Sequence, residues 1–240
     1  MATAYIFDVD GTLTPSRQSM DKKFAVWFKA FCNANDVYLV TGSDRPKTIE
    51  QIGEVIYNSC QRVYNCSGND VWEKDNNVYS NTWELPSAPM NFLRHELNQS
   101  KFKNKNGEHF EIRPGMLNFS IPGRGISLVE RQQYVLWDRK HCERENIAEQ
   151  FNSLYKHHGI ISSVGGETGL DIFPVGCDKS QILKDFDDYD ELIFFGDRCD
   201  INGNDFSIAH SIQINKRGKV HHVKSHVHTA NILKNKYSNT

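Results

Sequence analysis

Residues 4–14 read Ala4-Tyr5-Ile6-Phe7-Asp8-Val9-Asp10-Gly11-Thr12-Leu13-Thr14, and they hold the strongest chemical signal in the chain. The apolar run Tyr5–Phe7 stops at two aspartates and a glycine, which is typical of a buried strand that breaks into a turn. In open α/β sheets, ligands bind at the carboxyl ends of the strands. The sequence therefore predicts that Asp8 and Asp10 lie together at a ligand-binding edge.

Two carboxylates at this spacing suit metal-assisted phosphoryl chemistry. Asp8 and Asp10 are two residues apart, so both can converge on one hard cation such as Mg²⁺, which prefers carboxylate oxygens. Asp8 could then attack a phosphorus atom whose negative charge the metal offsets, while Asp10 moves a proton. The alternative is a common Asp-Gly turn with two solvated carboxylates.

Length and composition limit the other possibilities. The 240 residues are enough for one large domain or two small ones. No apolar run approaches the roughly 20 residues of a membrane-spanning helix, and the chain enters a strand without a signal peptide, so we expect a cytoplasmic protein with no membrane partner. The net charge of −2 gives no general attraction to nucleic acid. The six cysteines lack the spacing of a zinc or redox motif and are expected to be free thiols.

Hydroxyl groups follow the second predicted strand, Val37–Val40. That strand ends in Thr41-Gly42-Ser43-Asp44, at the same sheet edge as the two aspartates. A helix over Pro46–Tyr57 would point its amino end at this edge, and helix N-termini favour phosphate. Thr41 or Ser43 could thus hold a phosphoryl oxygen. The alternative is an ordinary helix N-cap, where serine and threonine are preferred anyway.

The middle of the chain reads as a second module. Strand-like pieces with hairpin turn residues fill 61–83, and Leu85–Pro89, with two prolines, has the composition of a linker. Beyond it, the pattern predicts helices near Met90–Gln99 and Glu143–His157 and strands near Glu108–Ile112, Gly115–Ile121, Ile160–Val164 and Gly169–Phe173. That order fits an α+β unit with helices on one face of a sheet. Another buried strand, Glu191–Phe195, follows and leads to Asp197.

Three arginines surround one predicted strand of this module. The segment 113–124 begins and ends in arginine, and Arg131 follows seven residues later. Arginine's planar fork suits bidentate phosphate binding, so Arg113, Arg124 and Arg131 could converge on one dianion. Arginines scattered over the surface are the alternative.

These motifs together resemble a known family. Asp8-Val9-Asp10-Gly11-Thr12 matches the nucleophile motif of the haloacid dehalogenase superfamily. The more specific match begins Arg113-Pro114-Gly115-Met116-Leu117-Asn118, ends in Gly123-Arg124 and continues to Glu130-Arg131, and it resembles the cap segment of eukaryotic-type phosphomannomutases. The resemblance extends from Ala4 to about Ile212. It implies an α/β fold with a Rossmann-like haloacid dehalogenase core, residues 1–83 and 175–240, and an inserted α+β cap domain, residues 84–174.

The resemblance also implies roles for individual residues. Asp8 would be the phosphorylated nucleophile, Asp10 the acid and base, and Lys179 the group that neutralises phosphoaspartate. The implied substrate contacts come from Arg17, Thr41, Ser43, Arg113, Asn118, Arg124, Arg131 and Asp171, and the implied metal site from Asp8, Asp10, Asp197 and Asp205. The chain departs from the family pattern at two positions, with Thr41 in place of a glycine and Gly169 in place of a serine that donates to the distal phosphate.

The implied activity is that of a phosphomannomutase, which interconverts mannose 1-phosphate and mannose 6-phosphate with Mg²⁺ as cofactor and a hexose 1,6-bisphosphate as activator. The expected partners are small hexose phosphates, and a homodimer through the cap is left open. The main alternative is a sugar-phosphate phosphatase on the same fold, in which water attacks phospho-Asp8. A catalytically silent sugar-phosphate sensor is a third possibility, which the intact Asp8, Asp10, Lys179 and Asp197 disfavour.

The tail from Val220 to Lys236 resembles no part of that family. It contains four histidines, His221, His222, His226 and His228. They could bind zinc or nickel, but no cysteine or acidic partner completes a ligand set. Alternating valines and histidines more often form an exposed edge strand, and we expect that structure here.

Overall fold

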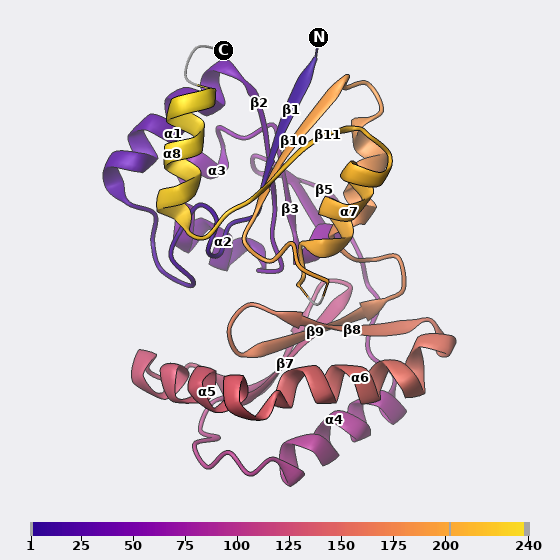
Figure 1. Cartoon of the computed structure of the whole chain (residues 1–240). Coiled ribbons are helices and arrows are strands. Elements are labelled where there is room, and N and C mark those ends of the chain that lie inside the picture. Colours follow the sequence, from indigo (N-terminus) through magenta and orange to yellow (C-terminus); the bar gives the residue numbers. More distant parts are fainter. Residues whose placement is uncertain (1, 202, 238–240) are drawn as a thin grey trace. The chain divides into compact units, whose positions relative to one another are not determined.

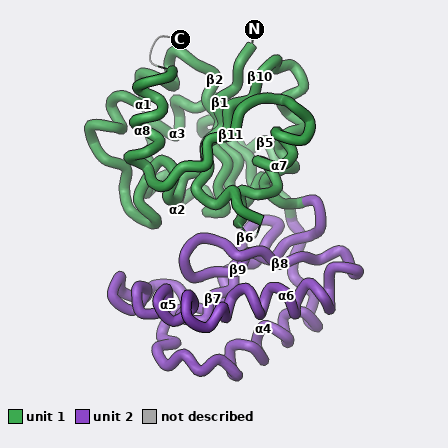
Figure 2. Tube along the Cα trace, viewed as in Figure 1, with its two compact units in different colours: residues 1–81, 177–240 green, residues 82–176 purple. Residues whose placement is uncertain are grey.

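The computed structural model describes residues 2–201 and 203–237. The chain folds into two compact units, residues 1–81 with 177–240 as unit 1 and residues 82–176 as unit 2 (Figure 2). Unit 2 is therefore inserted between the two segments that build unit 1. Its limits lie two residues outside the boundaries of 84 and 174 expected from the sequence.

A seven-stranded sheet forms the centre of unit 1 (Figure 1), with the strand order β11-β10-β1-β2-β3-β4-β5. The strands are β1 (Thr3–Phe7), β2 (Asp36–Val40), β3 (Arg62–Asn65), β4 (Asp70–Glu73), β5 (Asn76–Ser80), β10 (Glu191–Gly196) and β11 (Gly218–His222). From β11 to β3 in this order, neighbouring strands run parallel. β4 pairs antiparallel with β3, and β5 pairs antiparallel with β4. The carboxyl ends of β1, β2 and β10 therefore meet at one edge, where Asp8, Thr41 and Asp197 follow.

Helices cover both faces of this sheet. They are α1 (Lys22–Ala34), α2 (Arg45–Ile52), α3 (Glu54–Tyr57), α7 (Phe206–Ile214) and α8 (His226–Lys236), with 3₁₀ turns η1 (Cys66–Gly68) and η3 (Lys179–Phe186). Tyr5 and Phe7 pack with side chains of α1 and α8 on one face. Ala4 and Ile6 pack with side chains of α7 and η3 on the other. Burial on both faces explains why β1 reads as a continuous apolar run.

Several elements of unit 1 differ from the sequence-based expectation. The predicted helix Pro46–Tyr57 is divided into α2 and α3 at Gly53, whose φ of +80° suits glycine. Helices α7 and α8 lie outside the elements that the pattern predicts, whereas the start of the histidine-rich tail forms the expected edge strand, β11. Within residues 2–201 and 203–237, no helix has the length and apolar character needed to cross a membrane.

Unit 2 is an antiparallel sheet with helices on one face, in the strand order β6-β7-β9-β8. Its elements are β6 (Glu108–Arg113), β7 (Met116–Arg124), β8 (Ile160–Gly165), β9 (Gly169–Pro174), α4 (Ser87–Gln99), α5 (Leu128–His141), α6 (Glu143–Tyr155) and the 3₁₀ turn η2 (Lys156–His158). In β7, Leu117, Phe119 and Ile121 join the apolar core with the helices. Asn118 and Ser120 alternate onto the opposite face. The predicted α+β character of this module is confirmed.

Helix α5 lies outside the predicted elements of unit 2, and helix α4, predicted near Met90–Gln99, begins three residues earlier. Helix α5 starts after Ser127, whose hydroxyl accepts from the Glu130 N–H at 3.3 Å while the Glu130 carboxylate accepts from the Ser127 N–H at 2.9 Å. This reciprocal capping box is readable from the sequence as Ser-x-x-Glu. Helix α4 starts at Ser87, inside the predicted linker, because proline is tolerated in the first turn of a helix.

Candidate active site

A buried lysine joins two carboxylates at the carboxyl edge of the unit 1 sheet. Asp8 directly follows β1, and its N–H donates to the Phe195 carbonyl of β10 at 2.9 Å. Lys179, the first residue of η3, donates from Nζ to Asp8 Oδ1 at 2.5 Å and to Asp205 Oδ1 at 2.6 Å. The other oxygen of Asp205 accepts the main-chain N–H of Arg198 at 3.0 Å. All three ionisable side chains are almost fully buried, so each charge depends on its partner.

Asp197 adds a third carboxylate from the end of β10. One oxygen each from Asp8, Asp197 and Asp205 lie within 4.8 Å of one another, so the three could hold one metal ion. Gly11 makes room for this arrangement, because a Cβ at that position would lie 2.4 Å from Asp197 Oδ2. The φ of Gly11 is +80°, which also favours glycine.

Electrostatics show that this cluster carries excess negative charge. Burial raises the pKa of Asp8 well above its usual range, with Lys179 opposing the shift and Asp205 and Asp197 adding to it. Burial and the nearby Asp205 raise the pKa of Asp197 to about 7. Burial alone would lower the pKa of Lys179, but Asp205 and Asp8 outweigh it and raise that pKa, so the ammonium stays charged.

The residues present fit a divalent cation. Three carboxylates and one ammonium leave two negative charges, which a divalent ion would balance. Carboxylate oxygens are the ligands that Mg²⁺ prefers. The Thr12 hydroxyl, in the loop after Asp8, is also buried and has no hydrogen-bond partner among the described residues. A site with this donor set therefore suits Mg²⁺.

Asp10 lies beside this cluster but is held by other groups. Its Oδ1 accepts the main-chain N–H of Arg17 at 2.7 Å and the Gln51 amide at 2.9 Å, and its Oδ2 accepts the Ser43 hydroxyl at 3.4 Å. The carboxylate of Asp10 is not part of the three-carboxylate group. Gln51 was not singled out from the sequence, although a polar residue that shares the buried face of α2 with Thr48 and Ile52 is a readable signal.

Thr41 and Ser43 lie at the same edge, but neither caps the next helix. The N-cap of α2 is Asp44, whose carboxylate accepts the Lys47 N–H at 3.1 Å, so the ordinary N-cap alternative is wrong for both hydroxyls. The Thr41 hydroxyl instead accepts the N–H of Ser43 at 3.1 Å. The Ser43 hydroxyl points to Asp10, as described above.

Unit 2 contains a separate polar network around β7. Glu111 Oε2 accepts from the Arg113 guanidinium at 2.8 Å and lies 2.7 Å from Arg124 Nε. Arg124 also donates to Asn118, whose amide donates to Asp171 Oδ1 at 2.5 Å. Four of the predicted substrate contacts therefore belong to one network.

Two residues differ from the sequence-based expectation for this network: Arg131 lies outside it, and Glu111, at its centre, was not predicted. Arg131, on α5, donates from Nε to Glu167 Oε2 at 2.8 Å. Glu111 was overlooked in the sequence, although its position two residues before Arg113 on a strand places both side chains on one face.

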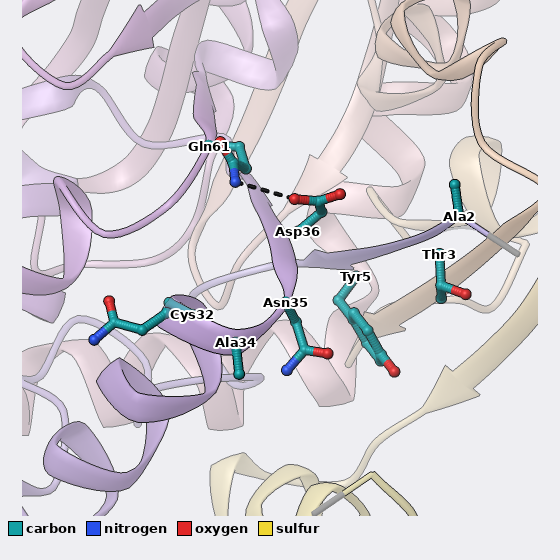
Figure 3. Close-up of a pocket in the computed structure, with 9 residues that line it drawn as sticks. Ala2, Thr3, Tyr5, Cys32, Ala34, Asn35, Asp36 and Gln61 are labelled. Carbon is teal, nitrogen blue, oxygen red and sulfur yellow. Dashed lines mark hydrogen bonds between the residues drawn. The ribbon is translucent and has the colours of Figure 1, made fainter. Parts of the chain in front are cut away.

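A cavity of about 440 Å³ lies at the opposite edge of the unit 1 sheet, where β1 and β2 begin (Figure 3). It is lined by Ala2, Thr3, Tyr5, Cys32, Asn33, Ala34, Asn35, Asp36 and Gln61. Within it, the Gln61 amide donates to Asp36 Oδ1 at 3.0 Å. None of the predicted site residues lines this cavity, so the candidate active site is the carboxylate cluster.

Comparison with solved structures identifies the fold. The C-terminal domain of Candida albicans trehalose-6-phosphate phosphatase superposes with a TM-score of 0.62 at 15% identity, covering 94% of this chain and 80% of that chain. Plasmodium falciparum IMP-nucleotidase superposes with a TM-score of 0.60 at 15% identity, covering 97% and 67%. The predicted fold class, a haloacid dehalogenase core with an inserted α+β cap, is confirmed.

Sequence comparison identifies the family. The family model of eukaryotic phosphomannomutase matches residues 25–239, so the motif around Asp8 precedes the matched segment. The match includes the tail from Val220 to Lys236, so the expectation that this tail resembles no part of the family is wrong. The phosphomannomutase of Glycine max is 32% identical over 214 residues, covering 86% of each chain. That of Saccharomyces cerevisiae is 29% identical over 239 residues, covering 96% of this chain and 92% of the yeast protein. The acidic cluster at the carboxyl edge of the unit 1 sheet agrees with these matches, and the chain belongs to the eukaryotic phosphomannomutase family.

Proposed function

We propose that this chain is a cytoplasmic phosphomannomutase that interconverts mannose 1-phosphate and mannose 6-phosphate. The observation that carries the proposal is the buried contact of Lys179 with Asp8, beside the acids Asp197 and Asp205. A module that only bound sugar phosphates would not need a buried carboxylate positioned as a nucleophile. Family membership supplies the substrate class.

In the proposed reaction, phospho-Asp8 passes its phosphoryl group to a sugar hydroxyl. The bond from the Asp8 oxygen to phosphorus breaks as the hydroxyl oxygen bonds to phosphorus, and the hydroxyl proton goes to Asp10. Lys179 stabilises the Asp8 carboxylate that is released. The hexose bisphosphate then reorients and returns its other phosphoryl group to Asp8, so a hexose 1,6-bisphosphate would act as activator.

We assign Asp8, Asp197 and Asp205 as the residues that would hold Mg²⁺. When bound, the ion supplies positive charge that offsets the phosphoryl oxygens. Asp10 also belonged to the sequence-based metal set. Its contacts with Ser43, Gln51 and the Arg17 main chain favour the acid and base role instead.

The polar network of unit 2 would bind the phosphate that does not react. Arg113 and Arg124 are brought together by Glu111, and Asn118 and Asp171 continue the same network. Arg131 is an additional cation that we assign to the same phosphate. Glu111 is paired with Arg113 and Arg124, and Glu167 is paired with Arg131, so a bound phosphate would compete with both glutamates for the guanidinium groups.

A sugar-phosphate phosphatase remains the second candidate, and Gly169 favours it. The family serine at this position would donate to the distal phosphate, whereas a Cβ on Gly169 would lie 2.7 Å from the Asn118 amide nitrogen. Gly169 therefore leaves room for the Asn118 side chain, but it supplies no hydroxyl to donate to the distal phosphate. A weaker distal grip would shift the balance from transfer toward hydrolysis.

We also propose that unit 2 mediates a homodimer. Leu128, Val129 and Leu136 are exposed on α5, with 57–67% of each side chain accessible. Val129 and Leu136 are one heptad apart and so share a face of the helix. Light scattering should give a dimer mass that Leu136→Lys reduces to that of a monomer; an unchanged mass would contradict this interface.

One assay tests the central proposal. Purified protein is given mannose 1-phosphate, a catalytic amount of glucose 1,6-bisphosphate and Mg²⁺, and mannose 6-phosphate and free phosphate are followed together. We expect mannose 6-phosphate to be the main product. Quantitative phosphate release without mannose 6-phosphate would establish the phosphatase instead.

Arginine variants test the distal phosphate site. Arg113→Ala, Arg124→Ala or Arg131→Ala each remove a charge-assisted contact and should weaken hexose bisphosphate binding about 10- to 150-fold. Hydrolysis of p-nitrophenyl phosphate, which has no second anion, should stay near wild type. Equal losses on both substrates would mean that the arginines stabilise unit 2 rather than bind phosphate.

A further inference from the structure

We propose that His222 is a positioning residue for Asp197 and thereby sets the affinity of the acidic cluster for its metal ion. The inference rests on the proposed metal site at Asp8, Asp197 and Asp205. It gives a role to one histidine of the tail, whose sequence pattern predicts only an edge strand. Among the described residues, the four tail histidines do not form a metal-binding group of their own.

The carboxylate of Asp197 is held differently from its two neighbours. Lys179 donates to both Asp8 and Asp205 and so fixes their oxygens. Within the part of the chain that the structure describes, no hydrogen bond reaches the carboxylate of Asp197. The direction of this side chain must therefore be set by its main chain and by the close approach of Gly11.

His222 holds that main chain. Its Nε2 lies 3.0 Å from the carbonyl oxygen of Asp197 and donates to it. The register of β10 and β11 pairs His222 with Gly196, and the next N–H, of Val223, donates to the Gly196 carbonyl at 2.9 Å. The His222 imidazole thus adds one hydrogen bond to the β10–β11 pairing, just beyond Gly196, and this bond is made to the main chain of Asp197.

This bond reaches the loop that completes the acidic cluster. The loop from Asp197 to Asp205 is closed by the Arg198 N–H on Asp205 and by the Asp205 N–H on the Arg198 carbonyl at 3.1 Å. The Asp197 carbonyl and the Arg198 N–H belong to the same planar peptide group. A bond from His222 to that carbonyl therefore also orients the N–H that donates to Asp205. Groups that orient metal ligands in this way contribute to metal affinity without touching the ion.

Direct metal binding tests the proposal. Mg²⁺ alone is titrated into the metal-free chain by calorimetry, for wild type, His222→Ala, His222→Gln and the control His226→Ala. Losing one hydrogen bond should weaken Mg²⁺ binding about 2- to 12-fold in His222→Ala. His222→Gln should stay within about twofold of wild type, because its amide nitrogen can donate at the position of Nε2. His226→Ala should match wild type, since His226 lies on α8 away from this bond.

The outcomes separate this inference from the metal site itself. Equal Mg²⁺ affinity in wild type and His222→Ala would overturn the role of His222 alone. A lower melting temperature of His222→Ala in EDTA with unchanged Mg²⁺ affinity would also overturn it, because the bond would then be merely structural. A wild-type chain that binds no Mg²⁺ would overturn the proposed metal site and this inference with it. His222 is exposed, so its replacement leaves no cavity and the variants should fold.

Discussion

Lys179 carries one positive charge between two buried carboxylates, and this controls what substitutions at the site do. If Asp8 or Asp205 loses its charge, the ammonium keeps the other partner and the site stays folded. If Lys179 is removed, two buried carboxylates lose their counter-charge, which typically costs several kcal/mol. Substitutions of single acids are therefore the cleaner tests of function.

Asp8→Asn should abolish turnover while the chain stays folded. The amide keeps the shape of the side chain but is no nucleophile, and Lys179 remains paired with Asp205. Mannose 6-phosphate formation and circular dichroism should be measured together. Wild-type activity in this variant would rule out a covalent intermediate on Asp8.

Asp10→Asn should slow turnover about 10²- to 10⁴-fold, the usual contribution of general acid–base catalysis. Because Asp10 lies outside the three-carboxylate group, Mg²⁺ affinity should stay close to wild type. Steady-state rates and Mg²⁺ titration distinguish the two roles. A large loss of Mg²⁺ affinity would return Asp10 to the metal site.

Asp197→Asn should stabilise the metal-free chain at neutral pH. The pKa of Asp197 is raised to about 7 in the folded chain, against roughly 3.9 when unfolded, so folding takes up a proton between these values. The contribution of Asp197 to the free energy of unfolding is therefore highest below about pH 4 and falls as pH rises through about 7. Thermal unfolding in EDTA should show the variant more stable at pH 7.5, by on the order of 2 kcal/mol, and less dependent on pH.

A control for this variant is Asp188→Asn, at an exposed aspartate outside the acidic cluster. It should leave the pH dependence of stability as in wild type. If Asp197→Asn lowered stability in EDTA at every pH, the carboxylate would have a favourable partner in the folded chain that the contacts do not show.

The sequence predicted the position of two acids at one sheet edge. Asp8 and Asp197 follow buried strands, and parallel strands bring such residues to one edge. Lys179 could be assigned only by resemblance, because nothing local shows that it reaches Asp8. Glu111 was missed because its acceptor role depends on two arginines that the fold brings to it.

At the scale of elements, β7 and β9 are paired so closely that glycine becomes a requirement. Ser120 lies opposite Gly169, and Asn118 lies opposite Asp171. The Asn118 amide fills the space in front of Gly169. A serine placed at position 169 of this chain would therefore displace the Asn118 amide.

Gly169→Ser should weaken hexose bisphosphate binding. The new Cβ would lie 2.7 Å from the Asn118 nitrogen, so Asn118 must move and its bonds to Arg124 and Asp171 must change. Losing one such hydrogen bond should weaken hexose bisphosphate binding about 2- to 12-fold. Binding by calorimetry checks this, with Ala88→Ser, at an exposed position on α4, as a control. Tighter binding would show that the serine hydroxyl outweighs the displaced amide.

Element boundaries could be predicted where apolar periodicity and caps agree. In helix α1, Phe24, Phe28 and Phe31 recur at helical spacing and Asp21 is the N-cap, so periodicity and cap give the same start. Helix α5 was missed because its apolar positions are sparse and Leu128, Val129 and Leu136 face outward. The break at Gly53 was missed because a single glycine is tolerated within a helical pattern.

At the scale of the whole molecule, the metal is expected to serve the site and not the fold. Both faces of the unit 1 sheet are packed by apolar clusters that do not include the acidic cluster. EDTA should therefore stop mannose 6-phosphate formation while circular dichroism stays unchanged, and added Mg²⁺ should restore activity. Activity that survives exhaustive chelation would contradict the metal requirement.

The order of strands in unit 1 could not be obtained from the sequence pattern. β10 inserts between β1 and β11, and the chain makes all of unit 2 before it returns to this sheet. Periodicity shows that each strand is buried but gives no information on its neighbours. Only resemblance to a family supplied the insertion.

That topology has a consequence for synthesis on the ribosome. Thr3 of β1 pairs with Glu191 of β10, so one side of β1 stays without its partner strand until the chain has been made as far as β10. At about 5–20 residues per second, the delay is roughly 10 to 40 seconds. We expect unit 2 to become protease-resistant on stalled nascent chains while the first segment of unit 1 still exposes apolar Ala4 and Ile6 to chaperones. The inserted unit would then be the first to fold, although the chain begins with the other.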